Sequence, residues 1–284
     1  MTDNLADLED QIERLDAAKP DEVARDEAKA LLERFLAALE SGAIRAASKQ
    51  PDGQWAAHPW VKRGILLCFR WGRLADYSIN RTFQFSDKDT LPPQDLSARA
   101  ELPRVVPGGT TVRSGVYLGR GVVIMPPSYI NVGARIDDET MIDSHVLVGS
   151  CAQVGRRVHL SAAVQVGGVL EPAGATPVII EDGVFVGAQC GIFESTLVGC
   201  CAVLGAGVIL TAGTPVYDLV REQIYRADGK CPLVIPEYAV VVPGARQAGG
   251  SFARDQGLAL QTPVIVRYRK PDDTHDLLLE TELR

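Results

Sequence analysis

Large aliphatic residues recur at every sixth position through the middle of the chain. In the stretch "INVGARIDDETMIDSHVLVGSCAQVG", residues 130–155, they are Ile130, Ile136, Ile142, Val148 and Val154. A helix repeats at about 3.6 residues and a half-buried strand at about 2, so neither explains this period. The complete series of sixteen is Val112, Leu118, Ile124, Ile130, Ile136, Ile142, Val148, Val154, Leu160, Val166, Ile180, Val186, Ile192, Val198, Leu204 and Leu210.

A small residue lies four positions after almost every member of the series. These residues are Val116, Val122, Ser128, Ala134, Thr140, Val146, Ala152, Val158, Val164, Val184, Cys190, Thr196, Ala202, Val208 and Thr214. A repeat of this kind predicts a solenoid. Each hexad would supply one short strand and one corner, with the aliphatic residue inside and the small residue where two walls converge. Glycines at many of the other turn positions fit corners that need positive φ or close backbone approach.

The flanks of the repeat have other periods. Residues 1–103 carry helical stripes and the apolar phrase "HPWVKRGILLCFRW", which predict an N-terminal helical domain. The repeat itself predicts a mainly β domain over residues 104–234. Residues 235–284 contain alternating, β-branched phrases and predict a small C-terminal β subdomain. The gap between the two runs of hexads predicts an external loop at residues 168–178, a common place for a binding site.

Composition and charge exclude several classes of protein. The net charge of −7 is unfavourable for a nucleic-acid partner, which needs a cationic face. No apolar run reaches the length of about 18 residues that spans a bilayer, and the start of the chain is acidic and helical, so we expect a cytoplasmic protein with no membrane partner. The six cysteines have no CxxC spacing, so we expect neither a bound metal nor disulfides.

The hexads resemble those of the hexapeptide-repeat acyltransferases, which fold as a left-handed parallel β-helix, a triangular prism with three hexads per coil. Several longer phrases are similar to one family in that class, the 2,3,4,5-tetrahydropyridine-2,6-dicarboxylate N-succinyltransferases. The phrases are "PRVVPGG" (103–109), "MPPSYINVGARIDDETMIDSH" (125–145), "VGSCAQVGRRVHLS" (148–161), "GGVLEP" (167–172), "IIEDGVFVGA" (179–188) and "VYD" (216–218).

The resemblance implies an enzyme of lysine and diaminopimelate biosynthesis that transfers a succinyl group from succinyl-CoA. The acceptor would be the amine of ring-opened tetrahydrodipicolinate, 2-amino-6-oxopimelate. It also implies a homotrimer with active sites between neighbouring prisms, and CoA lying under the 168–178 loop. Arg104 matches the family arginine that binds an acceptor carboxylate, and Asp143 matches the aspartate that touches the acceptor amine. No permanently bound cofactor is implied, because the thioester is already activated.

Departures from the family pattern cluster in these functional phrases. Gly191 stands where the family has a glutamate near the acceptor, and Glu194 aligns with a second glutamate that could compensate. His145 replaces a tryptophan and is a candidate general base. Pro215 and Leu219 replace expected cations. We therefore take Asp143, Glu194 and His145 as candidate catalytic residues.

Two alternatives remain open beside succinyl transfer. Lost cations favour a smaller acyl group, so the chain could be a diverged paralogue that uses acetyl-CoA on a related amino acid, in a specialised tabtoxin-like pathway. The third possibility is a non-catalytic trimeric scaffold.

Binding of the acyl-CoA is expected along a line of corner backbone groups, because small residues let pantetheine approach the main chain. The candidates are Gly167, Gly168, Ala188, Gly205 and Ala206. For the phosphates of CoA the candidates by position are Arg156, Arg157, Lys230 and Arg246.

Overall fold

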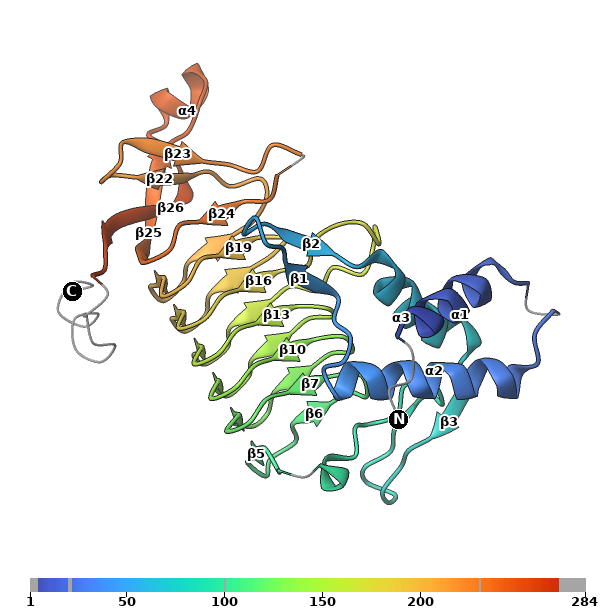
Figure 1. Cartoon of the computed structure of the whole chain (residues 1–284). Coiled ribbons are helices and arrows are strands. Elements are labelled where there is room, and N and C mark those ends of the chain that lie inside the picture. Colours follow the sequence, from blue (N-terminus) through green and yellow to red (C-terminus); the bar gives the residue numbers. More distant parts are fainter. Residues whose placement is uncertain (1–4, 20–21, 100, 230, 271–284) are drawn as a thin grey trace.

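The middle of the chain forms a three-walled prism of parallel strands, with three helices along one edge and a twisted β-hairpin at the far end (Figure 1). The computed structural model describes residues 5–19, 22–99, 101–229 and 231–270. Each hexad gives one two-residue strand followed by a four-residue turn, and the chain visits the three walls in rotation. The solenoid predicted from the period of six is confirmed.

The walls are three parallel sheets. Wall 1 contains β6 (Thr111–Val112), β9 (Tyr129–Ile130), β12 (Leu147–Val148), β15 (Gln165–Val166), β18 (Gly191–Ile192) and β21 (Ile209–Leu210). Wall 2 contains β7 (Tyr117–Leu118), β10 (Arg135–Ile136), β13 (Gln153–Val154), β16 (Ile179–Ile180), β19 (Leu197–Val198) and β24 (Val234–Ile235). Wall 3 contains β5 (Arg104–Val105), β8 (Val123–Ile124), β11 (Met141–Ile142), β14 (His159–Leu160), β17 (Phe185–Val186), β20 (Val203–Leu204) and the start of β25 (Ala239–Gln247).

Turns of the prism stack into three corners, which we name by the walls they join. Corner A leads from wall 3 to wall 1 and includes residues 143–146, 161–164, 187–190 and 205–208. Corner B leads from wall 1 to wall 2 and includes residues 149–152, 167–178 and 193–196. Corner C leads from wall 2 to wall 3 and includes residues 137–140, 155–158, 181–184 and 199–202.

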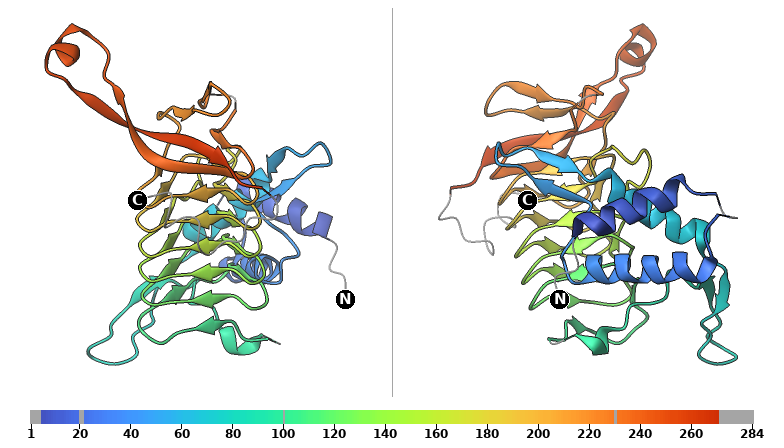
Figure 2. Two further views of the ribbon diagram at one scale, coloured as in Figure 1. Left: turned by 90° about the vertical axis from the view of Figure 1, so that its left-hand side faces the viewer. Right: turned by 45° about the vertical axis from the view of Figure 1, so that its right-hand side comes forward.

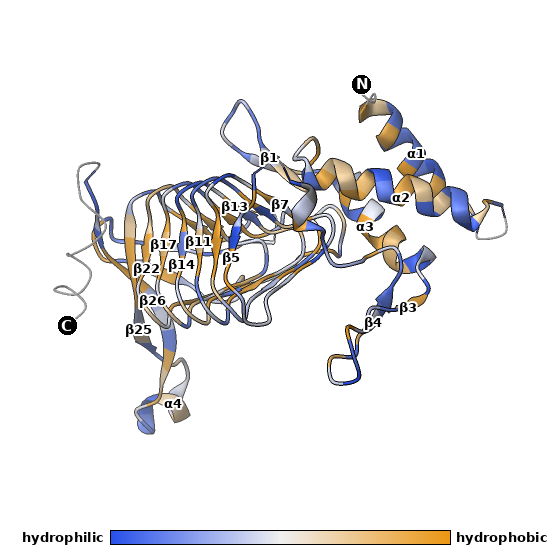
Figure 3. Cartoon of the chain, turned by 90° about the horizontal axis from the view of Figure 1, so that it is seen from below, coloured by the Kyte–Doolittle hydropathy of each residue, from blue (hydrophilic) through white to orange (hydrophobic). Residues whose placement is uncertain are grey.

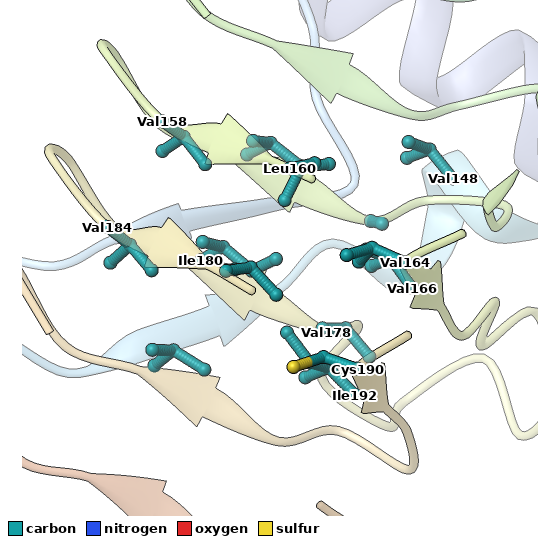
Figure 4. Packing of buried hydrophobic residues seen from close by; sticks show 14 of the residues in the cluster. Val148, Val158, Leu160, Val164, Val166, Val178, Ile180, Val184, Cys190 and Ile192 are labelled. Atoms are coloured by element: carbon teal, nitrogen blue, oxygen red, sulfur yellow. The ribbon is translucent and has the colours of Figure 1, made fainter. Parts of the chain in front are cut away.

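The interior of the prism is the stacked aliphatic series. All sixteen predicted residues are buried there in one cluster, and Figure 4 shows part of the stack between Val148 and Ile192. The small residues four positions later are also buried, apart from the last one, Thr214, which is partly exposed. Burying each large aliphatic side chain contributes about 1.5–3 kcal/mol, so the series dominates the stability of the fold.

The helical stripes of the N-terminal segment form α1 (Leu5–Ala17), α2 (Arg25–Glu40) and α3 (Pro59–Trp71), as predicted. Their apolar faces share a second core, which includes two turn residues of corner B, Val132 and Cys151. Figure 3 shows apolar and polar segments alternating along these helices, and apolar residues along the walls. Within the described residues, no helix combines the length and apolarity needed to cross a membrane.

Short strands join these helices to the prism. They are β1 (Ala47–Lys49) with β2 (Trp55–Ala57), and β3 (Leu74–Asp76) with β4 (Ser86–Lys88), followed by the 3₁₀ turn η1 (Leu96–Ala98). The β1–β2 hairpin lies against wall 2, where Lys49 and Trp55 both donate to Glu181.

The C-terminal strands continue the prism and then leave it. β25 begins in register with β20 and then pairs antiparallel with β26 (Ala259–Tyr268), forming a hairpin with α4 (Ser251–Asp255) at its tip (Figure 2). β22 (Val216–Asp218) and β23 (Gln223–Tyr225) extend the same sheet. The domain boundaries at 103 and 234 remain predictions, and residues 271–284 lie outside the described part of the chain.

Candidate functional site

Corner A presents a carboxylate and an imidazole in one turn. Asp143 is half-buried at the end of β11, and its Oδ1 accepts the backbone N–H of Ser144 at 2.7 Å. His145 is exposed and has φ 63°, because the third residue after a buried aliphatic is in the left-handed region in most of these turns. The predicted pair therefore lies together on one turn, and the second carboxylate oxygen of Asp143 accepts no hydrogen bond from the described residues.

Backbone N–H groups lie along the same corner. Those of Ala188 and Ala206 donate no hydrogen bond within the described residues. The coils approach closely here, and a Cβ on Gly187 would lie 2.6 Å from the nitrogen of Ala206. Gly205 is buried beside Ala206. Such unpaired N–H groups can donate a hydrogen bond to an amide carbonyl oxygen of pantetheine or to a thioester oxygen.

Arg104 opens the prism on wall 3. Arg104 is exposed in β5. It pairs with Val123 of β8, and Val123 pairs with Met141 of β11, so β5 and β11 are two strands apart. At the strand spacing of about 4.8 Å, the two strands lie about 10 Å apart along the prism. Arg104 therefore lies on the same wall as the strand that leads into Asp143, two coils away along the prism.

The remaining predicted residues lie on corner B. Gly167 and Gly168 begin the external loop, and a Cβ on Gly149 in the coil before would lie 2.2 Å from the nitrogen of Gly168. Glu194 is exposed, and its Oε2 accepts the N–H of Ala212 at 2.7 Å. The expectation of one corner line is therefore wrong, because these residues and those of corner A lie on the two opposite edges of wall 1.

Phe193 was not predicted as a site residue. It is the first residue of a corner B turn, and its ring lies beside Gly191 of wall 1. A Cβ on Gly191 would lie 2.5 Å from this ring, and a Cβ on Gly167 would lie 3.0 Å from it. A glutamate at position 191 could not share the space with the ring in this position. The signal in the sequence was the pairing of an unexpected glycine with an aromatic residue two positions later.

The external loop over residues 167–178 is anchored from the N-terminal segment. Lys62 of α3 is fully buried, and its ammonium group donates a hydrogen bond to the carbonyl oxygen of Ala175. Burial lowers the pKa of Lys62, and no carboxylate forms an ion pair with it among the described residues. Figure 1 shows this loop, in yellow, rising beside β2 and the start of α3. Lys62 was not predicted as a functional residue, although it lies three positions before Ile65 on the apolar stripe of the helix.

Lys62→Met is expected to release the loop without unfolding the protein. Methionine fills a similar volume and removes a buried charge, so the free energy of unfolding should be unchanged or higher by about 1 kcal/mol near neutral pH. Because the pKa of Lys62 is lower in the folded state than in the unfolded state, the parent protein becomes more stable as the pH rises through the folded-state pKa. The difference in free energy of unfolding between Lys62→Met and the parent should therefore disappear at alkaline pH. Thermal unfolding between pH 7 and 10 measures this.

The loop itself is assayed by limited proteolysis. Cleavage within 167–178 should be at least tenfold faster in Lys62→Met than in the parent chain, and KM for acyl-CoA should rise. The control is Lys29→Met, because Lys29 is partly exposed on α2. This variant should change neither the cleavage rate nor KM. Equal cleavage of all three proteins would show that Lys62 does not hold the loop.

The predicted phosphate-binding cations are scattered. Arg156 and Arg157 lie on corner C, away from wall 1, and Arg246 lies on β25. Lys230 lies outside the described residues. On corner C, Glu181, Cys200 and Glu237 have possible ligand atoms within 4.8 Å of one another, but Lys49 already forms an ion pair with Glu181 at 2.8 Å. We therefore assign no metal to this cluster.

The "VYD" phrase has a structural role. Asp218 is buried and accepts hydrogen bonds from the hydroxyl of Tyr268 and from the backbone N–H groups of Val220 and Arg221. Burial alone would raise the pKa of Asp218, but these hydrogen bonds outweigh it and lower the pKa. The aspartate thus fixes the β22 turn against β26.

Comparisons with known proteins agree with this arrangement. Residues 6–71 match the family described as "Tetrahydrodipicolinate N-succinyltransferase N-terminal", and residues 177–212 match "Hexapeptide repeat of succinyl-transferase". The 2,3,4,5-tetrahydropyridine-2,6-dicarboxylate N-succinyltransferase of Rhodopseudomonas palustris is 38% identical over 248 residues, which cover 86% of this chain and 85% of that one. The protein of the same name from Bartonella bacilliformis is 38% identical over 259 residues, with coverages of 87% and 88%.

A prism of hexapeptide repeats with a carboxylate and unpaired N–H groups along one corner defines the class: an acyltransferase built on a left-handed parallel β-helix. The relatives then give the family. The chain belongs to the 2,3,4,5-tetrahydropyridine-2,6-dicarboxylate N-succinyltransferase family.

Proposed function

We propose that the protein transfers a succinyl group from succinyl-CoA to the amine of tetrahydrodipicolinate in its ring-opened form. The observation that carries this proposal is the identity of 38% to the Rhodopseudomonas palustris relative over more than four-fifths of both chains. The position of Arg104 supports it, because a guanidinium binds carboxylate in two parallel hydrogen bonds and the acceptor is a dicarboxylate.

Asp143 acts on the acceptor amine in this proposal. The amine must lose its charge to attack a thioester, and the carboxylate oxygen of Asp143 that does not bond Ser144 would accept a proton from it. The amine nitrogen then bonds to the thioester carbon, the carbon–sulfur bond breaks, and CoA leaves as the thiol with the proton released from nitrogen. Unpaired N–H groups of corner A stabilise the oxyanion or hold the pantetheine arm.

We propose a homotrimer, with each site formed between two prisms. Within one chain, Asp143 and Glu194 lie at opposite edges of wall 1, so Glu194 would serve the site only against corner A of a neighbour. A cytoplasmic location follows in the same proposal, since acyl-CoA donors are made there and exposed thiols such as Cys231 stay reduced there.

Acetyl transfer is the second candidate, and one observation favours it. Phe193 fills the space over Gly191, so wall 1 is apolar at this position, where the resemblance implies a glutamate. Leu219 is 65% exposed where a cation was expected. A donor that ends in a methyl group needs no cation there, whereas a succinyl group ends in a carboxylate.

CoA thiol release separates these candidates. Purified protein is given succinyl-CoA or acetyl-CoA with tetrahydrodipicolinate or 2-aminopimelate, and a control without acceptor corrects for the protein's own cysteines. We expect acceptor-dependent release with succinyl-CoA at least tenfold faster than with acetyl-CoA. The reverse preference would replace the proposal by acetyl transfer, and no release with either donor would favour the non-catalytic scaffold.

A further inference from the structure

A second cavity lies on the other side of the prism from wall 1. It is a partly open cleft with a volume of about 250 Å³ between the β1–β2 hairpin and the turns of corner C. Figure 1 shows the hairpin in front of wall 2, and the hydrogen bond from Arg45 to Gln153 fixes the two together. Nothing in the proposed acyl transfer uses this cavity.

Arg45 lines the cavity and forms no ion pair among the described residues, although the charge of Asp137 lies near it. Its Nε donates to the amide oxygen of Gln153 at 3.0 Å, and its guanidinium carbon lies 5.3 Å from the ring centre of Trp55. No carboxylate of the described residues forms an ion pair with it. Burial, and then the neighbouring charge of Arg135, lower the pKa of Arg45 to about 10, and the charge of Asp137 offsets them only in part.

The carboxylates that line the cavity have other partners. Asp137 pairs with Arg135 at 2.9 Å. Glu181 accepts from the ammonium of Lys49 and from the indole of Trp55, both at 2.8 Å. One oxygen of Asp182 accepts the backbone N–H of Arg156 at 2.8 Å. The guanidinium of Arg45 therefore remains the natural partner for a negative charge that comes from outside the chain.

We propose that this cavity is a binding site for a small oxyanion, a carboxylate or phosphate group of a soluble metabolite, held by Arg45 with the side chain of Arg156 at the rim. The volume suits a ligand of a few heavy atoms and is too small to enclose a CoA molecule. A planar fork of N–H donors is the usual partner for either oxyanion in proteins. Both the N-terminal hairpin and the prism line the cavity, so a bound anion would fasten one to the other and act away from the acyl-transfer groove.

The test is a thermal-shift and calorimetric titration of the full chain with sodium phosphate and, separately, sodium acetate, each against sodium chloride of equal ionic strength. We expect at least one of the two anions to raise Tm and to bind with a measurable Kd. In Arg45→Gln the affinity should fall at least tenfold. The control is Arg157→Gln, which removes an exposed charge from the same corner outside the cavity and should bind as the parent does.

Two results distinguish a binding residue from a structural one. If Arg45 is kept for a ligand, Arg45→Gln without anion should melt at the parent temperature or above it, since a poorly compensated charge is gone. Phosphate binding alone identifies a phosphate ligand, and acetate binding alone a carboxylate. The proposal is overturned if neither anion binds the parent chain, or if Arg45→Gln binds as tightly as the parent. Neither result depends on acyl transfer.

Discussion

Asp143→Asn is expected to reduce turnover by about 100- to 10,000-fold, the range that general acid–base groups contribute, with Tm and oligomeric state unchanged. The amide oxygen of asparagine can still accept the N–H of Ser144, so the turn should keep its shape. What is lost is a group that takes a proton from the amine. The measurement is kcat and kcat/KM from thiol release with each acyl-CoA, beside a melting curve.

A matched control lies on corner C. Asp138 also accepts a backbone N–H, from Arg120 at 2.9 Å, so Asp138→Asn makes the same chemical change in a similar turn away from wall 1. Its activity should equal that of the parent chain. Parent-like turnover in Asp143→Asn would remove this carboxylate from the mechanism and direct attention to His145.

The fold was predictable because the aliphatic residues that fill its interior recur at every sixth position in the sequence. A prism wall needs one inward aliphatic residue per hexad, so the registers of the sixteen strands from β6 to β21 follow from the positions of residues such as Ile142 and Val148. The helices were predictable for a similar reason, since their apolar stripes have the helical period. Local patterns were sufficient wherever one residue faces one core.

The arrangement of the site was not predictable from the hexad. Turns that stack on the same corner are one full coil apart in the sequence. One coil is normally eighteen residues, as the pairing of Met141 with His159 shows. The external loop then lengthens one coil, so that Gln165 pairs with Gly191 twenty-six residues later. Counting by six therefore predicts which residues face outward, but it does not separate Ala188 on corner A from Gly167 on corner B.

Contacts between distant segments were also beyond the sequence. Lys62 and Ala175 meet because α3 packs beside corner B, and no local pattern encodes that packing. Arg45 and Gln153 meet for the same kind of reason, because the segment before the β1–β2 hairpin packs on wall 2. Lys62 and Arg45 are both charged residues in or beside a buried surface, where an unpaired charge is costly. Their roles can be recognised only once the residues that they contact are known.

Ile142→Asp is expected to unfold the prism. Ile142 is fully buried in β11, between Ile124 of the coil before and Leu160 of the coil after. An aspartate there loses the packing of the isoleucine and must either bury its charge or take up a proton, at a combined cost of several kcal/mol. Since a domain is stable by only about 5–15 kcal/mol, we expect insoluble protein or a Tm lower by more than 15 °C.

Two further variants make this test specific to the inward position. Ile142→Val keeps an aliphatic residue and should cost about 0.5–1.5 kcal/mol. Met141→Asp places the same charge one residue earlier, on the partly exposed outer face of wall 3, and should remain folded. Circular dichroism and thermal unfolding of the three proteins provide the comparison. A soluble Ile142→Asp protein with the parent Tm would contradict the inward assignment of the whole series, because every member is buried for the same reason.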